Sequence, residues 1–191
     1  MPPLVLRFTF LVFFILCPLS YATDHYVIDP KHTFSSFEYQ HWGLSAQRGQ
    51  FDKNSGFIDL DEDNKSGSIT IEIDASSVHT GSELFDNIMR SDSFFATQQF
   101  QKIIFNSTKL IFNDDKLSQV EGNLTIKDKT KPVVIDITQF NCRFMLLYLK
   151  RACGANGFTK ILRSDFGVDR FIPFVSDEVT LYFSVEGIKE E

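Results

Sequence analysis

Residues 34–42 read FSSFEYQHW, and small or aromatic side chains alternate there with polar ones. The polar side of this stretch consists of Ser36, Glu38 and Gln40. A period of two in a run that contains aromatic residues is typical of a β-strand with one buried face. The stretch therefore predicts a strand that turns one row of side chains toward the protein interior. That row comprises Ser35, Phe37, Tyr39 and His41.

Phenylalanine is abundant in this chain, with 21 residues out of 191 against one tryptophan and four histidines. Many of the phenylalanines lie at period two within short runs rich in valine, isoleucine and threonine. Rigid aromatic walls suit an apolar cavity, and they also suit a solid core. The composition makes a carrier of an apolar ligand a candidate, but plain core packing stays open beside it.

The rest of the chain predicts an all-β domain of eight or nine antiparallel strands, linked in sequence. The predicted strands cover residues 26–29, 34–42, 57–60, 68–74, 103–112, 117–126, 132–140, 157–164 and 177–187. Gly43 and Gly49 are expected to bracket a turn before Phe51. Closing such a sheet into a barrel removes its exposed edges, and about eight strands leave room for one small ligand. A β-sandwich of the same strands is the structural alternative.

One short helical crossover interrupts the strands at residues 82–90. Asp86 and Arg90 stand four residues apart there, acid first, which predicts a weak surface ion pair. Apolar side chains recur at helical offsets, and we expect them to face the barrel. These side chains are Leu84, Phe85, Ile88 and Met89.

The first 22 residues predict a secretory signal peptide. Arg7 gives a positive start, residues 8–16 form a short apolar region, and Ser20 and Ala22 are small residues at the −3 and −1 positions of a cleavage site. We expect cleavage before Thr23 and a single mature domain over residues 23–191. No later stretch is long and apolar enough to act as a stable membrane anchor.

The net charge of residues 23–191 limits the kinds of partner that the protein can bind, and the two cysteines of this part predict a covalent link. Removing the leader takes away one arginine, so 18 basic and 25 acidic residues remain, a net charge of −7. The absence of a basic run argues against nucleic acid and anionic lipid surfaces as partners. Cys142 and Cys153 are the remaining cysteines, and an even pair in an oxidising compartment predicts a disulfide.

No sequence motif for catalysis, a cofactor or a metal stands out, and we predict no residues for these roles. Asp61 and Asp63 resemble part of a calcium loop, but the glycine and distal glutamate of such a loop are missing. His41 shares the inward row of residues 34–42. Two interpretations of it remain open, a histidine bonded to backbone at a strand end and a polar anchor for a ligand head group.

Several motifs, taken together and in order, resemble the YceI-like family over almost the whole mature chain. They are Tyr26-Val27-Ile28-Asp29-Pro30, Phe37-x-Tyr39-x-His41-Trp42-Gly43-Leu44-Ser45, Gly49-x-Phe51, Arg90-Ser91, Phe94-Phe95, Gly122-Asn123-Leu124-Thr125-Ile126, Thr130-Lys131-Pro132-Val133, Arg163-Ser164-Asp165-Phe166-Gly167 and Ser184-Val185-Glu186-Gly187. The chain departs from the family at Phe85 and Ile88, where the family helix usually carries arginine and histidine. It also departs in residues 144–149, FMLLYL, which are more apolar than an exposed loop should be.

The resemblance implies a lipocalin-like β-barrel with a long internal tunnel. It also implies a periplasmic carrier of a polyisoprenoid or other long-chain amphiphile. An enzyme or accessory factor of isoprenoid or quinone metabolism, and an interaction protein with a filled barrel, are the alternatives. The sequence leaves a homodimer open. The predicted ligand-binding residues are Phe37, Tyr39, His41, Phe51, Ile69, Ile71, Ile73, Phe85 and Ile88.

Overall fold

The computed structural model describes residues 23–190, and the predicted signal peptide, residues 1–22, lies outside them. The strands are β1 (Asp24–Ile28), β2 (Phe34–His41), β3 (Ser45–Phe51), β4 (Asn54–Asp61), β5 (Ser66–Asp74), β6 (Val78–His79), β7 (Lys102–Asn113), β8 (Lys116–Ile126), β9 (Lys129–Met145), β10 (Lys150–Leu162) and β11 (Val175–Lys189). The helices are α1 (Glu83–Arg90) and two short 3₁₀ turns, η1 (Ala75–Ser77) and η2 (Arg163–Phe166). Among the described residues, no helix has the length and hydropathy needed to cross a bilayer.

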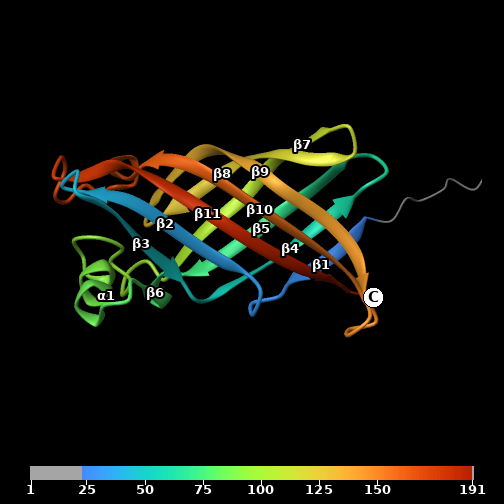
Figure 1. Cartoon of the computed structure of the whole chain (residues 1–191), viewed down its shortest axis with the longest axis horizontal. Helices are drawn as coiled ribbons and strands as arrows, with labels where there is room; N and C mark the ends of the chain where they lie inside the picture. Colours follow the sequence, from blue (N-terminus) through green and yellow to red (C-terminus); the bar gives the residue numbers. More distant parts are fainter. Residues whose placement is uncertain (1–22, 191) are drawn as a thin grey trace, which may run out of the picture.

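The strands close into an antiparallel barrel of eight long strands (Figure 1). β1 and β2 pair one after the other with β11, so they form a single interrupted strand. β3 and β4 continue the ring in the same way, by pairing with β2 and β1. β5 and then β7 to β11 complete it. The predicted barrel is confirmed, and the sandwich alternative is not the fold.

The turn expected between Gly43 and Phe51 is wrong for most of its length, because residues 45–51 form strand β3 opposite β2. The segment reads SAQRGQF, which has no apolar alternation to mark it as a strand. Gly49 lies in mid-strand, and a Cβ atom there would lie 2.3 Å from Cζ of Phe37. The glycine is therefore required by the close approach of a neighbouring ring, and not by a turn.

Strand β9 extends beyond both ends of the predicted 132–140, and β10 begins before the predicted 157 but ends at Leu162, where η2 follows. Together they form a long hairpin that contains both cysteines. Cys142 and Cys153 lie directly opposite each other in this hairpin and are joined by a disulfide. The predicted bond is confirmed. It clamps the two strands just before the apolar segment, residues 144–149, which makes the hairpin apex.

One half of the barrel interior contains buried side chains of the hydrophobic core that do not line the cavity described below, and we call it the filled half. It lies toward β1 and the chain's C-terminus, at the end opposite α1 (Figure 1). Ile71 on β5 pairs with Phe105 on β7, and both side chains are buried. The buried side chains that define the filled half are Tyr26, Ile28, Leu60, Ile71, Leu110, Leu117 and Val120.

Helix α1 lies over the other end of the barrel, beside β3 and β6 (Figure 1). Its predicted position is confirmed within one residue, but its predicted inward face is only partly right. Ile88 and Met89 are partly buried, whereas Leu84 is 67% exposed and Phe85 is 55% exposed. The first turn of the helix overhangs the barrel rim, so its apolar side chains reach the surface.

The predicted Asp86–Arg90 ion pair is absent, because each side chain has other partners. Asp86 is buried and accepts hydrogen bonds from the backbone N–H and the hydroxyl of Thr80. Arg90 donates to the backbone carbonyls of Ser76 and Val78, at 2.8 and 2.9 Å. Both bonds tie α1 to the η1–β6 segment, and this fixes the helix against the end of the barrel.

Candidate functional site

An apolar cavity of about 200 Å³ occupies the half of the barrel nearest α1. Its walls come from β2, β3, β5, β7, β8, β10 and β11, and from α1 and the loops beside it. Phenylalanine is prominent in the lining, to which eight phenylalanine side chains contribute. The eight are Phe37, Phe51, Phe85, Phe94, Phe95, Phe166, Phe171 and Phe183.

Seven of the nine predicted ligand-binding residues meet at this cavity. They are Phe37, Tyr39, His41, Phe51, Ile73, Phe85 and Ile88. The rings of Phe37, Phe51 and Phe95 contact one another in tilted and edge-on geometry, with centroids 5.4–6.5 Å apart. Aromatic clusters of this kind give a rigid wall, because each ring holds its neighbours in place.

Ile69 and Ile71 do not line the cavity, and this corrects the expectation of one common lining along β5. Ile71 is 6% exposed and belongs to the filled half, and Ile69 packs against the same core. Both residues share a strand face with Ile73, as the period of two requires. They differ from Ile73 in depth along the barrel, where the interior changes from open to packed.

Asp86 fixes the cavity wall that α1 supplies. Besides the two bonds from Thr80, its carboxylate lies 3.1 Å from Nδ1 of His79. Burial by itself raises the pKa of Asp86, but the bonds from Thr80 and His79 outweigh it and hold the pKa below its ordinary value. The charged carboxylate is therefore the form that the folded state favours.

Replacing Asp86 by Asn should destabilise the fold by about 1–3 kcal/mol near neutral pH, because an amide cannot accept all of these bonds. A lowered folded-state pKa stabilises the protein above the ordinary carboxyl pKa, 3.8, and this contribution disappears as the pH falls through the folded value. Urea unfolding of both proteins at neutral pH and at about pH 3 should show the difference shrinking with acid. A constant difference would contradict this account.

Arg163 brings a buried cation to the cavity wall, at the start of η2. Its side chain is 7% exposed, and among the described residues it has no salt bridge. Burial lowers the pKa of its guanidinium, although Asp177 and Asp169 oppose this shift from nearby. The guanidinium donates four hydrogen bonds of 2.5–2.9 Å to backbone carbonyls. The acceptors belong to Val168, Arg170, Val175 and Ser176.

Tyr39 and His41 complete the polar groups of this end of the cavity. Tyr39 is half-buried, and burial raises the pKa of its phenol while the charge of Arg163 opposes the shift. His41 is exposed where β2 ends, so it lies at the mouth and not deep inside. Arg163 was missed as a site residue, although it stood in a motif of the family resemblance. The local sequence around Arg163 does not indicate that its side chain lies at a cavity.

The mouth of the cavity is surrounded by exposed aromatic side chains from separate segments. Phe85 on α1 and Phe171 in the β10–β11 loop both line the cavity and are about half exposed. The ring of Trp42 stacks on Phe174, with centroids 4.4 Å apart, which joins the β2–β3 turn to the same loop. The cavity thus reaches the surface through an apolar rim.

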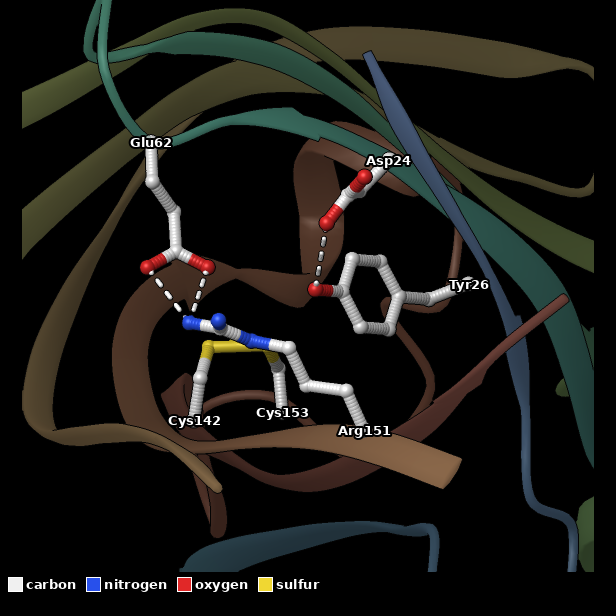
Figure 2. The surroundings of a disulfide bond; sticks show 6 residues. All are labelled: Asp24, Tyr26, Glu62, Cys142, Arg151 and Cys153. Atoms are coloured by element: carbon white, nitrogen blue, oxygen red, sulfur yellow. Dashed lines mark hydrogen bonds and ion pairs between the residues drawn. A yellow bond between two sulfur atoms is a disulfide. The ribbon is translucent and has the colours of Figure 1, made fainter. Parts of the chain in front are cut away.

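The opposite end of the barrel is closed by polar groups and the disulfide (Figure 2). Arg151 donates to both carboxylate oxygens of Glu62, at 2.7 and 2.8 Å. Tyr26 is fully buried beside Asp24, and burial together with this carboxylate raises its pKa to about 12. Glu62 also lies near both sulfur atoms, but the disulfide leaves no thiolate there to bind a metal.

Comparison with known proteins places this barrel among relatives. The sequence matches the YceI-like domain family over residues 26–187. The chain belongs to the YceI-like family. It is 32% identical over 175 residues to Protein YceI of Salmonella arizonae, and the match covers 90% of this chain and 91% of that protein.

Solved structures show the same fold. Burkholderia cenocepacia BcnA matches with a TM-score of 0.70 and 21% identity, over 83% of this chain and 98% of that one. A polyisoprenoid binding domain from Saccharophagus degradans, implicated in plant cell wall breakdown, matches with a TM-score of 0.68 and 19% identity, over 86% of this chain and 98% of the domain. A YCEI protein of Campylobacter jejuni matches with a TM-score of 0.69 and 25% identity, over 80% and 90% of the two chains. These likenesses show the fold of the chain.

Proposed function

We propose that this protein is a carrier that holds one long-chain amphiphile, such as a polyisoprenoid, in the cavity beside α1. The observation that carries the proposal is the cavity itself, an apolar space inside the barrel with eight phenylalanines in its lining. Burial of each methylene of a ligand chain contributes roughly 0.8 kcal/mol, so a few isoprene units offset the cost of association. The polyisoprenoid binding domain of Saccharophagus degradans, which shares the fold, is in keeping with this ligand class.

The polar side chains of the cavity support a position for the head group of the proposed ligand. Tyr39, His41 and Arg163 are the titratable side chains in the cavity lining, and the exposed His41 lies at the mouth. The chain of the ligand would lie against the phenylalanines, and its head group would remain among these three side chains or outside the rim. This arrangement provides binding groups, whereas a reaction would also require a nucleophile or a proton-transfer pair near the bound chain.

The proposal also places the mature chain, residues 23–191, in the periplasm after cleavage of the leader. It is tested by purifying the full-length gene product from the periplasmic fraction, determining its N-terminal sequence and analysing its organic extract by mass spectrometry. We expect a sequence that begins at Thr23 and a long-chain amphiphile in about equimolar amount. Protein that has been unfolded, extracted and refolded serves as the empty control, and added polyprenol should rebind to it.

The alternatives give different results in the same experiment. An empty protein that also fails to bind added polyprenol would favour the interaction protein with a filled barrel. Chemical conversion of the bound lipid during incubation would favour an enzyme of isoprenoid or quinone metabolism. A start at Met1 would contradict the periplasmic carrier in its proposed location.

A further inference from the structure

The apex of the β9–β10 hairpin is a second apolar surface, at the end of the barrel opposite the cavity mouth. Figure 1 shows this apex projecting beyond the barrel near the C-terminus. Its side chains are among the most exposed large apolar groups of the part that the structure describes. The exposed fractions are 60% for Phe144, 81% for Leu146, 82% for Leu147, 39% for Tyr148 and 73% for Leu149.

The apex keeps a leucine where a turn would ordinarily take a small or polar residue. Leu149 has a φ angle of 51°, in the left-handed region that is unfavourable for a bulky side chain. Lys65, Asp114 and Lys127 have positive φ in the β4–β5, β7–β8 and β8–β9 turns, and the aromatic residues Trp42 and Phe171 have positive φ at the other end of the barrel. Leu149 is therefore a bulky apolar residue in a left-handed backbone conformation that disfavours such a side chain.

The apolar side chains follow one another around a turn, so they do not come from a single strand face. Phe144, Leu146, Leu147 and Leu149 occupy consecutive or nearly consecutive positions around a tight turn, and all are at least 60% exposed. A folded protein partner would have to enclose such a tip from several sides. A lipid layer surrounds a projecting apolar tip without any special shape.

The sequence has no basic run and so argues against an anionic lipid surface, but the fold places one positive charge on each strand at the base of the apex. Arg143 precedes Phe144, and Lys150 follows Leu149. Among the described residues, neither has an ion-pair partner, whereas Arg151 is held by Glu62. Cations just behind an apolar tip match the layering of an anionic membrane, where phosphates lie outside the hydrocarbon. The disulfide between Cys142 and Cys153 keeps the two strands together at this level.

We propose that the β9–β10 apex inserts shallowly into the interface of an anionic lipid bilayer, with Arg143 and Lys150 contacting lipid phosphates. The contact is reversible, because four or five apolar side chains give a small anchor. It involves no residue of the cavity, so it stands independently of the carrier function. It also leaves the cavity mouth, at the other end of the barrel, facing away from the lipid.

The test measures co-sedimentation of the mature protein with two kinds of vesicles, pure phosphatidylcholine and phosphatidylcholine with phosphatidylglycerol. Leu146→Ser/Leu147→Ser should lower binding to both kinds by at least about tenfold. Leu44→Ser is the matched control, because Leu44 is 84% exposed at the opposite end of the barrel, and it should bind like the wild type. Circular dichroism checks that each variant is folded, and exposed positions are expected to tolerate serine.

A second double substitution tests the two positive charges at the base of the apex. Arg143→Gln/Lys150→Gln should weaken binding to the phosphatidylglycerol vesicles by about tenfold and leave binding to pure phosphatidylcholine unchanged. Several results would overturn the proposal: no binding by the wild type, unchanged binding after Leu146→Ser/Leu147→Ser, or loss of binding with Leu44→Ser alone. Analytical ultracentrifugation of the same variants identifies the rival occupant. A wild-type dimer that dissociates on Leu146→Ser/Leu147→Ser, without vesicle binding, would assign the apex to a second copy of the chain.

Discussion

Ile73→Trp should abolish lipid retention and leave the barrel folded, whereas Ile71→Trp should destabilise the barrel. The two residues share one face of β5 and lie two positions apart, but only Ile73 lines the cavity. A tryptophan at residue 73 can extend into existing space and occupy the site of the ligand chain. At residue 71 the same side chain meets packed neighbours and should cost about 1–3 kcal/mol.

The two variants are compared by urea unfolding and by mass spectrometry of the organic extract. Ile73→Trp should retain at least about tenfold less lipid than the wild type, with a change in the free energy of unfolding below about 1 kcal/mol. Ile71→Trp should unfold at a lower urea concentration. Equal destabilisation by both substitutions would mean that the cavity does not offer spare volume, and full retention by Ile73→Trp would place the lipid elsewhere.

Arg163→Met should be the most damaging single change in the loop between β10 and β11. The substitution keeps an unbranched apolar stem but removes the donors for four backbone carbonyls, of Val168, Arg170, Val175 and Ser176. Buried or half-buried carbonyls without partners are costly, and we expect a loss of about 3 kcal/mol or more. The loop that carries Phe171 and Phe174 should also become mobile, which weakens lipid retention.

Arg170→Met is the matched control for this prediction. Arg170 belongs to the same loop, but it is exposed and its guanidinium contacts only the Ser93 hydroxyl and the face of Phe171 among the described residues. Its removal should cost less than about 1 kcal/mol. Urea midpoints and proteolysis of residues 167–174 measure both effects. Similar midpoints for the two variants would show that the carbonyl network of Arg163 is not what holds the loop.

The barrel could be predicted from the sequence because its strands alternate cleanly. The inward row of β2 and the isoleucines of β5 are on the predicted faces, since a period of two fixes the face of a strand. β3 was missed because its sequence is polar on both faces. In addition, a glycine such as Gly49 is compatible both with a turn and with a mid-strand position beneath a phenylalanine ring. That contact depends on the neighbouring strand, which the local sequence cannot reveal.

The candidate site was predicted in part for a related reason. Alternation identifies which side chains face inward, but it contains no information on depth along the barrel, so Ile71 and Ile73 look equivalent. The inward face of α1 was misjudged at Leu84 because the helix lies at the rim, where one side of it meets solvent. Arg163 could not be ranked as a site residue, because its burial results from a loop that folds back over it from residues 168–176.

The filled half of the barrel gives the cavity a floor at a fixed depth. In the proposed function, a chain that enters past Phe85 and Phe171 would meet the buried side chains around Ile71, which do not line the cavity. A cavity with a fixed floor acts as a gauge of molecular length. Short chains leave part of the space empty, and long ones must bend or protrude from the mouth. If the proposed carrier function holds, the depth at which the isoleucines of β5 stop lining the cavity sets how many carbon atoms of a ligand are sheltered from water.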